Sequence, residues 1–113
     1  MSDNARWVRP LGTAADRGWD VVVDDAVQGW QHTGLYVARL AAGERRDLTA
    51  GEWEHVVVPL SGSVTVESEG DRAVLAGRAS VFAGPTDVAY VARDRALAVV
   101  AHDGPARVAV CAA

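Results

Sequence analysis

The sequence predicts an all-β domain built as a single antiparallel barrel or jelly roll. Its apolar residues come in short runs that start about every ten residues, separated by Gly, Pro, Asp and charged residues. Valine is frequent in these runs, and β-branched side chains favour a pleated, half-buried surface. A chain of 113 residues has room for one such domain, so we expect residues 1–113 to fold as a unit.

The expected strands follow one another along the chain. They cover residues 6–10, 19–23, 34–40, 53–60, 63–68, 73–76, 79–82, 88–92, 96–101 and 106–112. Residues 38–46 are rich in alanine, so a helix there is the alternative. Because glycines bracket that segment and Tyr36-Val37 favours extended structure, we expect a strand instead.

Three turns separate strands in the second half of the chain. Glu69-Gly70-Asp71 supplies the positive φ that a hairpin needs, so residues 63–68 and 72–76 should pair. Ser61-Gly62 predicts a turn just before an alternating segment. Residues 84–87, Gly-Pro-Thr-Asp, predict another, because proline fixes φ and aspartate bonds nearby backbone.

Charge excludes two classes of partner. The formal net charge is −4, and acidic and basic residues are mixed along the chain, which gives no footprint for nucleic acid or a membrane surface. The basic doublet Arg45-Arg46 is flanked by Glu44 and Asp47, so we interpret it as a solvated turn.

The single cysteine and the polar N-terminus indicate in which cellular compartment the protein is expected. Cys111 is the single cysteine and lies in an apolar run, which predicts a buried, inert thiol and no internal disulfide. Residues 1–4 are polar and no apolar run approaches membrane-spanning length, so we expect a soluble cytoplasmic protein.

Several segments carry a resemblance to a known family. Residues 56–66, VVVPLSGSVTV, resemble the first cupin motif, in which a strand ends in a glycine turn and a second strand follows. Residues 80–91 contain Ser-Val-Phe, Pro-Thr-Asp and Tyr-Val, and Asp-Arg-Ala follows at 94–96. With residues 106–111, this order is similar to the N-terminal half of the 5-deoxy-glucuronate isomerase family of inositol catabolism.

The resemblance implies a cupin barrel and a larger protein around it. Family members carry two cupins and interconvert 5-deoxy-glucuronate and a 2-keto-deoxygluconate isomer. Their metal ligands lie in the second cupin, in a region that this chain does not contain, so no family ligand transfers to a position here. The implied role is structural: completing the two-domain fold and burying an interface. We do not expect this chain alone to catalyse the family's ketol isomerisation, which needs a base and an electrophile or metal at the carbonyl.

The metal positions of cupins are largely replaced in this sequence. A metal-binding cupin brings three imidazoles and a carboxylate together inside the barrel. Aligned on Gly62, the carboxylate position is His55, and two imidazole positions fall near Thr49 and Gly51. The last imidazole position is Leu97, which cannot coordinate a metal. We therefore expect no metal or other cofactor in this barrel and no catalytic residue.

An unconventional metal enzyme is one rival interpretation. His32, His55 and His102, with Glu52 and Glu54 beside the second, would have to converge in space although no spacing predicts it. Otherwise His55 is a packed or hydrogen-bonded core residue, while the other two histidines lie at loop or strand ends.

A stand-alone binding module is the other rival. Strand parity places Trp53, His55 and Val57 on one face, which the motif alignment points inward. Trp53, His55 and Tyr90 would then line a lumen for a small sugar acid. Trp19 and Trp53 are expected in the core or the barrel lining.

Assembly is expected in either case. Trp7 and Trp30 lie beside polar residues and are candidates for a surface patch that another domain or subunit covers. A barrel without its partner exposes apolar surface and a strand edge, so the expected partner is a second cupin domain or a second copy in a dimer.

Overall fold

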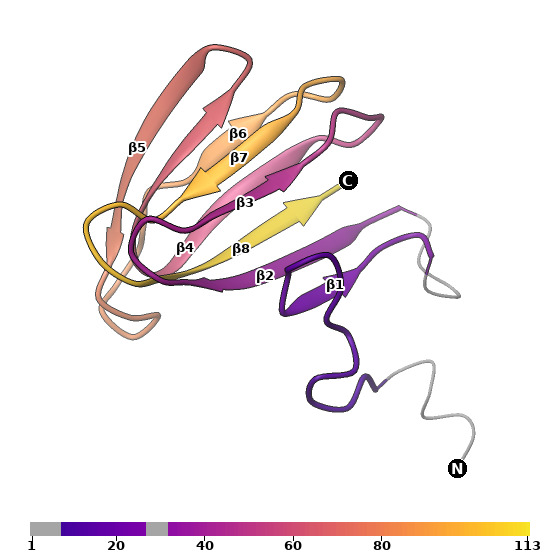
Figure 1. Ribbon diagram of the computed structural model, residues 1–113, viewed down its shortest axis with the longest axis horizontal. Helices are drawn as coiled ribbons and strands as arrows, with labels where there is room; N and C mark the ends of the chain where they lie inside the picture. Colours follow the sequence, from indigo (N-terminus) through magenta and orange to yellow (C-terminus); the bar gives the residue numbers. More distant parts are fainter. Residues whose placement is uncertain (1–7, 27–31) are drawn as a thin grey trace.

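The computed structural model of the chain describes residues 8–26 and 32–113. Within these ranges the chain is all-β and forms no helix, and its curled antiparallel sheet makes a half-open barrel (Figure 1). The strands are β1 (Val21–Val23), β2 (Gly34–Leu40), β3 (Arg45–Leu48), β4 (His55–Ser68), β5 (Asp71–Arg78), β6 (Ala89–Val91), β7 (Leu97–Val100) and β8 (Ala106–Ala112). The all-β prediction is confirmed.

Strand β4 is the centre of the sheet. The hydrogen-bonded order is β1-β2-β8-β4-β7-β3, with β5 and β6 also pairing β4, and every pairing is antiparallel. The first half of β4 pairs with β8 and β6, whereas its second half pairs with β5 and β7. A single 14-residue strand therefore joins the two halves of the barrel.

The predicted turn at Ser61-Gly62 is wrong, because β4 continues through it. Gly62 has φ +80°, and the pairing register shifts on both sides of it, as in a β-bulge. A Cβ at Gly62 would lie 2.5 Å from the carbonyl oxygen of Pro105. Glycine thus bends the strand from one half of the barrel to the other without ending it.

The predicted hairpin between β4 and β5 is confirmed. Glu69 and Gly70 both have positive φ, 48° and 90°, which is the backbone of a tight two-residue hairpin turn. Ser68 faces Asp71 directly across this turn.

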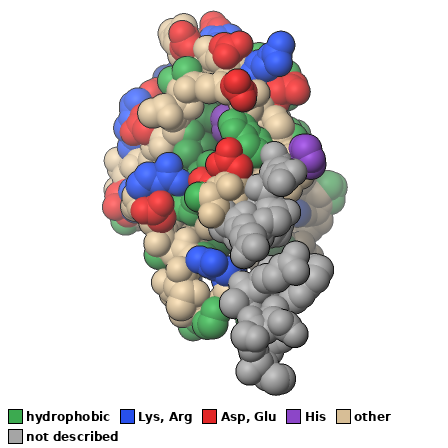
Figure 2. Space-filling model, turned by 90° about the vertical axis from the view of Figure 1, so that its right-hand side faces the viewer, with side chains coloured by type: hydrophobic (Ala, Val, Ile, Leu, Met, Phe, Trp, Pro, Cys, Tyr) green, Lys and Arg blue, Asp and Glu red, His purple; other side chains and the backbone are tan. Residues whose placement is uncertain are grey.

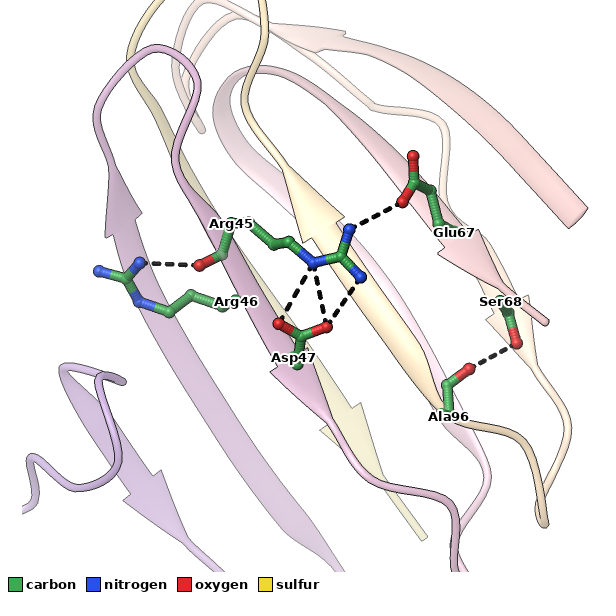
Figure 3. A network of polar contacts seen from close by, with 6 residues as sticks. All are labelled: Arg45, Arg46, Asp47, Glu67, Ser68 and Ala96. Carbon is green, nitrogen blue, oxygen red and sulfur yellow. Dashed lines mark hydrogen bonds and ion pairs between the residues drawn. The ribbon is translucent and has the colours of Figure 1, made fainter. Parts of the chain in front are cut away.

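The interpretation of Arg45-Arg46 as a solvated turn is wrong, because both residues belong to β3, the terminal strand of the path. Arg45 points outward, where its guanidinium lies 3.0 Å from Asp47 and 3.1 Å from Glu67 on β4 (Figure 3). Arg46 is half-buried, and its Nε donates to the carbonyl of Gly18 at 2.6 Å. Charged side chains on an edge strand also discourage pairing with other chains.

Two other predicted strands are not present. Residues 79–82 form bends and turns, and Phe82 is 95% exposed. Residues 8–10 are irregular, and the rest of the segment 6–10 lies outside the described residues. The alternative helix over residues 38–46 does not form, since β2 and β3 occupy that segment.

The core lies between the two halves of the barrel. Its fully buried side chains include Leu40, Val57, Val64, Val99, Val108 and Val110. The prediction that Cys111 is buried is wrong. Its neighbours Val110 and Ala112 point into the core, so strand alternation turns the Cys111 thiol to the outer face. Within the described residues, no helix has the length and apolar character needed to cross a membrane.

Candidate functional site

A cavity of about 210 Å³ opens at one end of the barrel. Figure 2 shows hydrophobic side chains gathered around a hollow on this side of the molecule, with a histidine among them. The lining residues come from β2, β3, β4 and the loops beside them. They are Arg17, Trp19, Tyr36, Asp47, Leu48, Thr49, Ala50, Gly51, Trp53 and His55.

His55 is the buried polar group of this cavity. It begins β4 and faces Ala112 and Val91 across the sheet, which turns its side chain inward. The side chain is 5% exposed, and Nδ1 has no hydrogen-bond partner among the described residues. Burial lowers the pKa of His55, so the imidazole is neutral at pH 7.

Aromatic rings form the wall beside the imidazole. Trp19 and Tyr36 meet edge to face, with ring centroids 5.6 Å apart and an interplanar angle of 61°. Burial, with a smaller contribution from Asp24, raises the pKa of Tyr36, so its hydroxyl stays protonated. Trp53 is half-exposed. The wall therefore combines flat apolar surface with a few polar atoms, which is the usual composition of a small-molecule site.

The charges at the rim already have partners. The guanidinium of Arg17 lies 3.0 Å from Asp16 and 3.2 Å from Asp24. Asp47 is paired with Arg45. The cavity thus carries little net charge from these groups.

Three of the four cupin ligand positions meet in this cavity. Thr49, Gly51 and His55 all line it, and Leu97 is buried in the core. One hydroxyl and one imidazole remain, which does not fit the donor set of a divalent metal in a cupin.

The three-histidine alternative has no support in the geometry. His32 and His102 are exposed outside the strands, and Nδ1 of His102 lies 3.2 Å from a carboxylate oxygen of Asp103. Across residues 8–26 and 32–113, no three His, Cys, Asp or Glu side chains are grouped so that they could hold a metal ion.

Trp53, His55 and Tyr90 do not share one cavity. Trp53 and His55 line it together, as strand parity indicates. Tyr90 pairs with Val56, the neighbour of His55, so it lies on the opposite face of the sheet and is 62% exposed. Its hydroxyl donates to the carboxylate of Glu54. The prediction that Tyr90 lines the lumen is wrong, because its pairing with Val56 turns its side chain to the outer face.

Part of the lining has no signal in the sequence. Arg17 and Asp47 come from segments that read as polar loops, and only the curvature of the sheet brings them to the cavity. Trp19 was expected in the core or lining and serves both. Trp7 and Trp30 lie outside the described residues.

Comparison with known proteins places this geometry among the cupins. The model of the KduI/IolB family matches residues 7–113. An IolB-like protein from Salmonella typhimurium LT2 is similar in structure, with a TM-score of 0.74 and 22% identity over 87% of this chain and 38% of that one. The chain therefore spans about two fifths of that relative.

Two shorter structures share the fold. A cupin protein from Bacteroides fragilis matches with a TM-score of 0.62 and 17% identity, over 87% of this chain and 78% of that one. KdgF from a Halomonas species matches with a TM-score of 0.57 and 15% identity, over 76% and 72% of the two chains. No curated protein sequence matches the chain.

Proposed function

The chain belongs to the KduI/IolB family, and from this membership we propose that it is a metal-free cupin domain with a structural role in a sugar-acid isomerase. Its barrel would complete a two-barrel fold or an oligomer, while the ketol isomerisation proceeds at a metal held elsewhere. The single observation that carries the proposal is that Thr49, Gly51 and Leu97 stand at positions where the alignment on Gly62 places cupin metal ligands.

The side chains of the cavity also support a structural role for this barrel, with the isomerisation at another site. A ketol isomerisation moves a proton between neighbouring carbons and needs a base together with an electrophile at the carbonyl. His55 is neutral and is a candidate base, but the one cation that lines the cavity among the described residues, Arg17, is already paired with two carboxylates. One half of the required pair is therefore missing from these residues.

Metal analysis tests the proposal directly. The chain is purified without added metal, incubated with excess Mn²⁺, Ni²⁺ or Zn²⁺, desalted and analysed by mass spectrometry of the elements. We expect clearly substoichiometric metal, with no difference between wild type and His55→Ala. Stoichiometric metal that His55→Ala abolishes would overturn the proposal, and the exposed His102→Ala serves as the matched control for nonspecific imidazole binding.

Small-molecule binding is the second candidate, and the unpaired Nδ1 of His55 favours it. An imidazole nitrogen buried without a partner costs free energy that a ligand hydroxyl or carboxylate would recover. Trp19 and Trp53 supply flat surface for a sugar ring. Arg17, also in the lining, would bind an acid group by exchanging its ion pairs with Asp16 and Asp24.

Tryptophan fluorescence tests this second candidate. A titration with uronic and 2-keto sugar acids should shift the emission of wild type, because two tryptophans line the cavity. Replacing Trp53 with Phe should remove part of the shift, and His55→Leu should weaken binding about tenfold through the lost hydrogen bond. An emission spectrum unchanged up to millimolar ligand would exclude the candidate.

A further inference from the structure

The outer face of strands β2, β8, β4 and β6 carries two apolar rows, on the side opposite the cavity. The first row runs across all four strands in register and consists of Leu35, Cys111, Val56 and Tyr90. Together with Thr33, Glu54 and Ala113, these residues line an open groove. Tyr90 and Cys111 are exposed, so the row presents apolar surface to solvent.

The second row lies one step further along the same strands. Val37, Ala109 and Val58 face one another across β2, β8 and β4; Val37 and Val58 are half-buried, and the small Ala109 between them is 8% exposed. Val88, just before β6, is 53% exposed. Two adjacent rows make a continuous apolar strip, in contrast to the charged edge strand β3.

Charges of opposite sign close the two ends of this strip. Beyond the second row, Arg39 and Arg107 face each other in register, and both are exposed. In the part of the chain that the structure describes, neither guanidinium lies within ion-pair distance of a carboxylate. Asp20 accepts the backbone N–H of Arg39 through Oδ2 at 2.8 Å. At the other end stands Glu54, exposed and hydrogen-bonded to the hydroxyl of Tyr90.

Two copies of this face can pair their opposite charges in one of the two possible symmetric arrangements. In a symmetric dimer with the two sheets face to face, the two-fold axis lies in the plane between them. An axis parallel to the strands would bring the arginines of one copy onto those of the other. An axis across the strands reverses the strand direction, so Glu54 of each copy meets Arg39 and Arg107 of its partner.

We propose that this face is the interface between two copies of the chain, packed with the two-fold axis across the strands. The strip would form the apolar centre of the interface and the charged ends its polar rim, as in stable protein interfaces. The inference rests on the assembly role proposed above and names its surface and its partner.

Charge reversal with rescue tests the arrangement. The full chain is studied by sedimentation equilibrium over a range of concentrations at low ionic strength, where rim charges act most strongly. Wild type should be a dimer. Arg107→Glu and Glu54→Arg should each raise the dimer dissociation constant about tenfold or more, because each places like charges together at both ends of the interface.

An equimolar mixture of the two variants provides the rescue. In the mixed dimer, Glu54 of the Arg107→Glu copy faces Arg107 of the Glu54→Arg copy. At the other end, the arginine introduced at position 54 faces the glutamate introduced at position 107. Both ends of the interface therefore pair opposite charges again. The dissociation constant should return close to that of wild type. Arg45→Glu is the matched control and should have no effect, because Arg45 is exposed on β3, the terminal strand in the other half of the barrel.

Two results would overturn the proposal. A wild-type monomer at every concentration would mean that another partner, such as the second barrel of a longer chain, covers this face. A dimer that neither reversal weakens, or that the mixture does not restore, would mean that the copies meet elsewhere. Both results are independent of metal content, so they leave the metal-free proposal to its own test. If a reversal variant fails to fold, Tyr90→Arg probes the same face from an exposed position.

Discussion

The carbonyl oxygen of Gly62 on β4 lies so close to Gly77 on β5 that a Cβ on Gly77 would come within 1.9 Å of it. Gly77 also has φ +71°, which side chains rarely adopt. The two glycines thus let β5 close against β4 where β4 bends between the two halves of the barrel.

Replacement of Gly77 by Ala should therefore destabilise the fold strongly. We expect a loss of about 2–4 kcal/mol in the free energy of unfolding, from backbone strain and from the displaced carbonyl. The measurement is urea denaturation followed by circular dichroism. Gly43→Ala is the control, because Gly43 has φ +84° but a Cβ there would meet no atom within 4 Å, so only strain of about 1 kcal/mol should appear. Equal losses in the two variants would contradict the steric explanation.

Stability should depend on pH through His55. Burial lowers the pKa of His55 in the folded state, whereas the unfolded chain titrates near the ordinary value of about 6.5. The unfolded state therefore binds more protons as the pH falls below that value, and the folded state loses stability there.

The comparison of two variants isolates this effect. His55→Leu should flatten the decline in melting temperature between about pH 6.5 and pH 5, whereas the exposed His102→Gln should leave it unchanged. A decline of the same slope in His55→Leu would assign the pH dependence to other groups.

The carboxylate of Asp87 should hold the loop after β5 in place. It accepts the backbone N–H of Ala76 at 2.8 Å and of Gly77 at 2.9 Å, and these bonds lower the pKa of Asp87. Asp87→Ala should lower the melting temperature at pH 7. Because the folded pKa is depressed, the stabilisation is present above about pH 4 and is lost as the pH falls through the folded pKa.

The matched control for Asp87 is an exposed acid without such contacts. Glu52→Ala removes a carboxylate of similar exposure near the cavity. Its melting temperature should equal that of wild type at pH 7. If the two variants melt alike at pH 7, the two backbone bonds of Asp87 contribute no measurable stability.

The thiol of Cys111 should react in the folded protein. Cys111 is exposed on the outer face, so a thiol reagent should modify it without denaturant. If the proposed dimer forms, labelling should slow as the protein concentration rises and should be faster in Arg107→Glu than in wild type at the same concentration. Reaction only after unfolding in both proteins would contradict the exposure of this side chain.

Local patterns predicted most of the strands but not how they connect. Alternation and valine content placed residues 34–40 and 106–112 correctly. Ser61-Gly62 has the composition of a turn, and only the approach of Pro105 shows that the glycine bends a continuous strand. Arg45-Arg46 has the composition of a solvated loop, and it is a strand because β7 pairs with it.

The candidate site was also predicted only in part, because local spacing places some of its residues and pairing between distant strands places the others. The alignment on Gly62 correctly grouped Thr49, Gly51 and His55, which line one cavity. These residues are close together in the sequence, so their relative positions depend on local spacing. Tyr90 was misplaced, because its face depends on which residue of β4 it pairs with.

From the order of its residues alone, this protein is an all-β cupin whose usual metal-ligand positions hold other side chains, since strand alternation, turn chemistry and motif spacing are local properties. The folded chain determined which face each side chain occupies: His55 without a partner inside, and Tyr90 and Cys111 outside. Pairing between strands distant in sequence sets that choice, and a shift of one residue would reverse it.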